Sequence, residues 1–309
     1  MIEFILRSCL RMDYGHHISI RVMVIDLLLT ASGPDLAAGL IWKEQMMKRK
    51  PYDSDLNPFE QICIAPYVAQ KLGPGRNRTV DILEVVNALC YMTRTGCQWR
   101  LLPHDFPAWQ HVAYYYYTWI EDGTLEHIND CLREELRIEL GRDPEPSVAI
   151  IDSQSVKTAR GGEEVGYDKH KNVKGIKRNI MVDMLGLLIV VIVTSAAAQD
   201  SDTGQELLID AKKKTGRLKK VYADQGYKTW LVKWIARWQK FVLELVIKPP
   251  DQHGFQVLPK RWRVEQFLGW LHAYRRLSKD YEQTTASSQG MIYLVSIRLM
   301  TRKLARMRY

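Results

Sequence analysis

The sequence predicts a mixed α/β fold, in which a β-sheet flanked by helices follows a small all-helical domain. Short runs rich in β-branched residues gather after residue 146, whereas helical periodicity dominates before it. The net charge changes sign near the same place: residues 1–150 carry a net −5 and residues 151–309 a net +14. A chain of 309 residues has room for about two domains of ordinary size.

The first half of the chain shows helical patterns. After a candidate N-cap at Thr79, apolar residues recur at helical spacing until Gly96, a typical stop. The residues of this apolar face are Ile82, Val85, Val86, Leu89 and Met92. Residues 107–120 and 125–140 predict two further helices.

Three segments follow from these patterns. Residues 1–45 show no sustained period, and we treat them as a poorly predicted N-terminal extension that packs loosely. Residues 46–145 form the helical domain, which ends where glycine and two prolines interrupt the pattern in Gly141–Pro146. Residues 146–309 form the α/β domain.

In the second half, strands and helices follow in the order β, β, β, α, β, α, β, α, α. The predicted strands are residues 147–152, 179–183, 187–194, 218–223 and 241–247, and the predicted helices are residues 203–214, 229–238, 260–277 and 291–304. A tight Leu-Gly link joins the second and third strands, and later strands alternate with helices. This order predicts a mixed sheet covered by helices.

Composition excludes several classes of protein. An apolar fraction of 46% disfavours disorder, and no uncharged apolar run is long enough to cross a membrane. The N-terminus lacks the pattern of a secretory signal. Five cysteines without a CxxC pair argue against a disulfide framework or a zinc site, so we expect a protein of the reducing cytoplasm. The net charge of +9 favours a polyanionic partner.

Three acidic residues are candidates for one catalytic site. Asp152 ends the first strand, Asp224 holds the corresponding place after the fourth, and Glu265 lies in the predicted helix 260–277. Strand ends of such sheets meet at the functional edge. Carboxylates suit Mg²⁺ or Mn²⁺, and two such ions about 4 Å apart support phosphoryl transfer. Taken singly, each Asp could instead be a turn residue.

Basic residues accompany Glu265 along the predicted helix. Arg261, His272, Arg276 and Lys279 fall on the helical face that carries Glu265, which suits contact with a phosphate backbone. The alternative is an ordinary solvated face on which cations screen one acid.

A second basic cluster precedes the predicted strand 179–183. Lys174, Lys177 and Arg178 are crowded there, and such a cluster suits phosphate contacts that do not depend on base sequence. It could equally be a solvated loop.

Beyond these patterns, the chain resembles bacterial insertion-sequence transposases of the DDE class, in the insertion sequence five group, close to the insertion sequence four-like superfamily. The resemblance covers about residues 50–304. It is carried by the stretches RTGCQWRLLPHDFPAWQHV, AIIDSQSVKT, KGIKRNIMVDMLGLL, VYADQGY, VEQFLGWL and MIYLVSIRLM.

The resemblance implies a ribonuclease-H-like catalytic core without an inserted β domain, in which Asp152, Asp224 and Glu265 are the metal-binding triad. It implies cleavage at transposon ends, strand transfer of the 3′-hydroxyl into target DNA, and a cofactor of two Mg²⁺ or Mn²⁺ ions. The helical domain would help to recognise the terminal inverted repeats. A homodimer or larger assembly on double-stranded DNA is expected, and a cytoplasmic protein that joins the nucleoid when active.

The chain departs from the Tyr, Arg, Glu, Lys signature of related groups. Arg261 and Glu265 match it, but Leu258 stands where Tyr would and His272 where Lys would. Lys279 is a candidate substitute for the Lys, and Arg275 is a further candidate DNA contact. Residues 1–45 lie outside the resemblance, and Met46 or Met47 is the typical family start.

Two alternatives remain. One is a structure-specific nuclease of the same fold that performs no strand transfer. The other is a non-catalytic DNA-binding protein derived from a transposase. The three acids argue against the second, because carboxylates repel a phosphate backbone unless a metal ion is bound.

Overall fold

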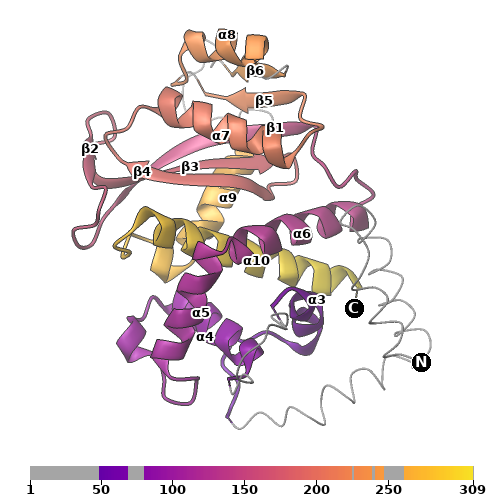
Figure 1. Ribbon diagram of the computed structural model, residues 1–309, viewed down its shortest axis with the longest axis vertical. Coiled ribbons are helices and arrows are strands. Elements are labelled where there is room, and N and C mark those ends of the chain that lie inside the picture. Colours follow the sequence, from indigo (N-terminus) through magenta and orange to yellow (C-terminus); the bar gives the residue numbers. More distant parts are fainter. Residues whose placement is uncertain (1–48, 69–79, 225, 239–240, 247–260, 309) are drawn as a thin grey trace. The chain divides into compact units, whose positions relative to one another are not determined.

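The structure is a computed structural model that describes residues 49–68, 80–224, 226–238, 241–246 and 261–308 (Figure 1). The chain divides into two compact units, residues 1–51 and 52–309, and every helix and strand of the described residues belongs to the second. The expected loose packing of residues 1–45, and the positions of Thr79 and Leu258, lie outside the described residues.

Helices form the part of the second unit that precedes the sheet. They are α3 (Pro58–Val68), α4 (Ile82–Thr95), the short 3₁₀ helix η1 (Trp99–Leu101), α5 (Trp109–Glu121) and α6 (Thr124–Glu139). The predicted stop at Gly96 is confirmed, since its φ of 73° is the left-handed value that favours glycine. The N-cap of α4 is Asp81, whose carboxylate accepts from the Leu83 N–H at 2.9 Å.

The sheet is mixed, as predicted. Its strands are β1 (Val148–Lys157), β2 (Gly166–Asp168), β3 (Val173–Asp183), β4 (Leu188–Ser195), β5 (Lys220–Ala223) and β6 (Val242–Leu245). They follow the order β2, β3, β1, β5, β6, with β4 also paired to β3 (Figure 1). Strand β3 is antiparallel to β1, β2 and β4, whereas β1, β5 and β6 run parallel.

Two strands are longer than predicted, and β2 was not predicted. Strand β1 continues to Lys157 and β3 already begins at Val173. The prediction stopped at charged residues because they disfavour strands in general. Here the extended pairing needs a glycine, since a Cβ at Gly175 would lie only 2.0 Å from the Val156 carbonyl oxygen of the neighbouring strand.

Helices cover both faces of the sheet. They are α7 (Asp200–Lys214), α8 (Thr229–Trp238), α9 (Trp262–His272), the 3₁₀ helix η2 (Arg275–Leu277) and α10 (Thr285–Arg308). Buried residues of α7 and α8 pack with Ile151 and Val221 on one face. Those of α9 and α10 pack with Ile150 and Tyr222 on the other.

The predicted helix 260–277 is wrong at its end, because α9 stops at His272. Arg276 then lies in η2, where its guanidinium pairs with Glu282 at 2.7 Å and donates to the Cys97 carbonyl at 3.0 Å. A continued helix would have placed Arg276 on the exposed face of Glu265. Instead the chain turns after His272, and Arg276 is buried in its ion pair with Glu282.

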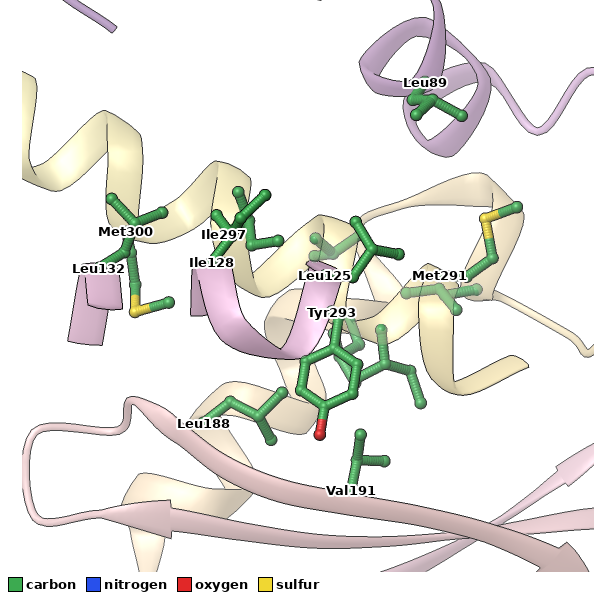
Figure 2. Close-up of a cluster of buried hydrophobic side chains, with 14 of the residues drawn as sticks. Leu89, Leu125, Ile128, Leu132, Leu188, Val191, Met291, Tyr293, Ile297 and Met300 are labelled. Carbon is green, nitrogen blue, oxygen red and sulfur yellow. The ribbon is translucent and has the colours of Figure 1, made fainter. Parts of the chain in front are cut away.

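Helix α10 supplies much of the first core. Figure 2 shows Ile297 and Met300 of α10 beside Ile128 and Leu132 of α6, while the Tyr293 ring points toward β4. Residues on both sides of position 146 thus share one core, and the predicted domain boundary there stays a prediction. Within the described residues, no helix combines the length and apolar character needed to cross a membrane.

A buried amide links three elements across this core. Asn129 of α6 is fully buried; its carbonyl accepts from the Ser296 hydroxyl of α10 at 2.7 Å, and its amide donates to the Leu188 carbonyl of β4 at 3.0 Å. The Arg133 guanidinium also donates to Leu188, at 3.3 Å. These buried hydrogen bonds join α6 to α10 and to strand β4 of the sheet.

We predict that Asn129→Leu lowers the free energy of unfolding by about 1–4 kcal/mol, because the Ser296 hydroxyl loses its acceptor and the Leu188 carbonyl loses one of two donors. Urea denaturation of the full chain measures this. The matched control, Gln110→Leu on the exposed side of α5, should change stability by less than about 0.5 kcal/mol. Equal effects of the two substitutions would contradict the role assigned to Asn129.

Candidate active site

The pairing of β1 with β5 places two acids level with each other. In the parallel register Ile150 lies opposite Tyr222, and Asp152 and Asp224 follow two residues after each of them. Because side chains alternate across a strand, both carboxylates are directed to the face of Ile150 and Tyr222. Helix α9 packs on that face, and Glu265 lies in its first turn.

Arg261, directly before α9, connects two of the three acids. Its Nη2 atom lies 3.8 Å from Asp152 Oδ2 and 3.9 Å from Glu265 Oε1. The Arg261 side chain is 11% exposed and Asp152 15%, whereas Glu265 is 40% exposed. The guanidinium thus supplies a positive charge that reduces repulsion between the acids.

Burial raises the pKa of the Asp152 carboxyl to about 6. Arg261 and the Ser153 N–H, which donates to Asp152 Oδ1 at 2.8 Å, favour the charged form, while nearby Asp224 opposes it. A carboxyl removed from water in this way gains more from added positive charge than an exposed one does.

The types of ligand fit a hard divalent cation. Asp152, Asp224 and Glu265 offer only oxygen atoms, which Mg²⁺ and Mn²⁺ prefer. The buried Tyr227 hydroxyl, three residues after Asp224, has no hydrogen-bond partner among the described residues. As they stand, the described side chains form no group of three or more acids, histidines or cysteines close enough to hold an ion. In this structure the Arg261 guanidinium neighbours both Asp152 and Glu265.

Four of the predicted DNA-binding residues are exposed. Lys174 lies near the start of β3, and His272 ends α9. Arg275 and Lys279 follow α9, and both are exposed. The His272 Nε2 atom lies 2.9 Å from the side-chain amide nitrogen of Gln154, two residues after Asp152 on β1, so the end of α9 is held close to the acids.

The other predicted DNA contacts on β3 and η2 are buried. Lys177 is 5% exposed and its ammonium pairs with Asp200 at 2.9 Å, while the Arg178 guanidinium donates to the Leu277 carbonyl at 2.9 Å. Burial lowers the pKa of Arg178 to about 10. Arg276 is buried with its acid partner as well. The structure therefore does not bring Lys177, Arg178 or Arg276 to a surface that a phosphate can reach.

Sequence reasoning missed Asp200, the first residue of α7. A Cβ built at Gly226 would lie 3.0 Å from Asp224 Oδ1 and 3.5 Å from Asp200 Oδ2, so both carboxylates border the same backbone position. The alternation of side chains along β3 could have pointed to such an acid, since odd-numbered residues of that strand face α7. Lys177 is one of them and needs an acid on that side.

Much of the chain matches known transposase families. Residues 143–300, just over half of the chain, match the family of the transposase DDE domain. Residues 62–129, which include α4 and α5, match the family of putative transposases of the IS4/5 family. Among curated proteins, none matches the chain.

The matched regions agree with the fold. The first contains the whole sheet together with Asp152, Asp224 and Glu265, and the mixed α/β architecture preceded by helices is that of a ribonuclease-H-like DDE domain. The predicted fold class is therefore confirmed, and the predicted family with it. The chain belongs to the DDE transposases of the IS4/5 family, enzymes that carry out phosphoryl transfer on DNA.

Proposed function

We propose that this transposase cuts DNA at the ends of its insertion sequence and transfers the freed 3′-hydroxyl to target DNA, with Asp152, Asp224 and Glu265 as the catalytic, metal-holding acids. The observation that carries the proposal is the convergence of three acids from β1, the end of β5 and α9 toward one face of the sheet. Arg261 lies within 4 Å of two of them.

Each acid has a distinct structural support. Asp152 lies within β1, where its backbone pairs with Ile180 of β3, two residues beyond the last pair between β1 and β5. Asp224 lies in the turn after β5, where its Oδ1 accepts from the Gly226 N–H at 2.9 Å. Glu265 is more exposed than Asp152, the other acid beside Arg261, and it is the one of the two that an approaching DNA backbone meets first.

Two Mg²⁺ or Mn²⁺ ions, when bound, would activate the attacking oxygen and stabilise the leaving oxygen of an in-line displacement. The chain itself contributes the oxygen ligands and the orientation of those ligands. Fixed orientation matters because small misplacements of reacting groups cost large factors in rate.

The exposed basic residues Lys174, His272, Arg275 and Lys279 support a proposed set of contacts with the DNA backbone. Phosphate contacts of this kind supply affinity that depends on salt and not on base sequence. Recognition of the terminal inverted repeats is assigned to the helical segment 46–145. Joining two ends implies at least a dimer on DNA, in the bacterial cytoplasm and on the nucleoid when active.

We predict that Asp152→Asn, Asp224→Asn and Glu265→Gln each reduce cleavage at cognate terminal repeats by about 1000-fold, because a lost ligand removes several kcal/mol of charge stabilisation. End cleavage with Mg²⁺ on labelled DNA measures the rate, and an added target plasmid reports strand transfer.

Asp210→Asn is the matched control, because Asp210 is an exposed acid on α7 that pairs only with Lys213 among the described residues. Its cleavage rate should equal that of the unaltered chain. Wild-type rates in the three triad variants would overturn the proposed triad. Cleavage without any strand transfer product would favour the nuclease alternative.

A second prediction concerns the grip on DNA. Lys174→Ala should weaken binding to all DNA sequences alike and reduce the slope of log affinity against log salt by about one unit, because one phosphate contact is lost. Gel shifts over a salt series measure the slope. Lys213→Ala removes an exposed cation from α7 and should leave the slope unchanged. Equal slopes for Lys174→Ala and the unaltered chain would exclude Lys174 from the DNA contacts.

A further inference from the structure

Tyr227 has a buried hydroxyl that the fold itself does not use. The residue is 1% exposed, and its ring packs on α7, where a Cβ at Gly204 would lie 2.7 Å from ring atom Cε1. Among the described residues, nothing forms a hydrogen bond with its hydroxyl. A buried hydroxyl without a hydrogen-bond partner lowers the stability of the fold, so its presence calls for a physical reason.

Tyr227 shares a turn with Asp224, whose carbonyl accepts from the Tyr227 N–H at 3.4 Å. Burial raises the pKa of Tyr227 well above its ordinary value, and the charges of Asp152, Asp200 and Asp224 raise it further. The group therefore stays protonated and acts as a hydrogen-bond donor at neutral pH. Carboxylates are strong acceptors for such a donor, and Asp224 lies three residues before Tyr227 in the same turn.

The segment that carries Asp224 and Tyr227 is fastened to the first turn of α7. The Lys228 N–H donates to the Ser201 hydroxyl at 2.9 Å. Asp200, in the same turn, borders Gly226 and is held by the buried Lys177 ammonium at 2.9 Å. The position of Asp224 thus depends on a support that reaches it from the face of the sheet opposite α9.

We propose that Tyr227 is a positioning residue for divalent metal binding, whose hydroxyl donates a hydrogen bond to an acid of the triad when the acids hold an ion. This rests on the proposed role of Asp224 as a metal ligand. The hydroxyl orients a carboxylate that would otherwise rotate, in the manner of the outer partners that commonly orient metal ligands.

The proposal has two opposite consequences for Tyr227→Phe. The metal-free protein loses an unsatisfied buried hydroxyl and keeps the ring, so its thermal unfolding midpoint should stay the same or rise. Metal binding loses an orienting donor, so the affinity for Mn²⁺ should fall by about 10- to 100-fold. A tyrosine that served packing alone would leave the Mn²⁺ affinity unchanged.

The experiment titrates the full-length protein with Mn²⁺ and follows free Mn²⁺ by electron paramagnetic resonance, with thermal unfolding of the metal-free protein alongside. Tyr116→Phe is the matched control, because Tyr116 is a buried tyrosine of α5 whose hydroxyl donates to the Ser287 carbonyl of α10 at 2.6 Å, away from the three acids. Its Mn²⁺ affinity should equal that of the unaltered chain.

Asp224→Asn separates this proposal from the one on which it rests. If Asp224→Asn leaves Mn²⁺ affinity unchanged, the proposed triad is wrong. If Asp224→Asn weakens binding while Tyr227→Phe does not, the triad stands and the role of Tyr227 is overturned. A lower thermal midpoint in metal-free Tyr227→Phe would also overturn it, since the hydroxyl would then be serving the fold.

Discussion

The parallel pairing of β1 with β5 is the constraint on which the site depends. Strand β1 is hydrogen-bonded to β3 on one side and to β5 on the other, so Asp152 cannot shift without breaking a ladder. The register then sets Asp224 level with it, one residue past the end of β5. Helix α9 adds Glu265 from above the same face. Rigidity therefore decreases from Asp152, within a strand, to Asp224, which relies on a turn and on the start of α7.

Charged residues of β3 hold the layers together. Lys177 reaches the α7 side and pairs with Asp200, whereas the next residue, Arg178, reaches the opposite side and donates to the backbone of η2. Alternation along one strand thus fastens a helix to each face. Such buried cations are costly unless they are paired or hydrogen-bonded, and removal of one partner costs more than the bond itself contributes. Part of the basic surplus of the second half belongs to this internal framework.

Most of the elements could be predicted from periodicity and turn residues, because apolar spacing and glycine stops act locally. The helix 229–238 has the predicted bounds, and Gly96 ends α4 as expected. Errors arose where tertiary partners override local preference: β3 accepts Lys177 because Asp200 neutralises it, and α9 ends early because Arg276 turns inward. Of the candidate site, the acids at strand ends could be predicted. The contacts of Arg261 and the isolation of the Tyr227 hydroxyl depend on segments far apart in sequence and have no local signal.

Arg261 gives the acids a counter-ion that belongs to the chain itself. At the proposed metal site, loading of a divalent ion by Asp152 and Glu265 would therefore be an exchange of one cation for another and not a simple addition. An incoming ion would have to outcompete the Arg261 guanidinium, which is tethered to the chain and so present at a high effective concentration. A monovalent cation brings no more charge than Arg261 already does, so this competition discriminates by valence before any question of ionic radius arises. In the metal-free protein, Arg261 partly neutralises the negative charges of Asp152 and Glu265.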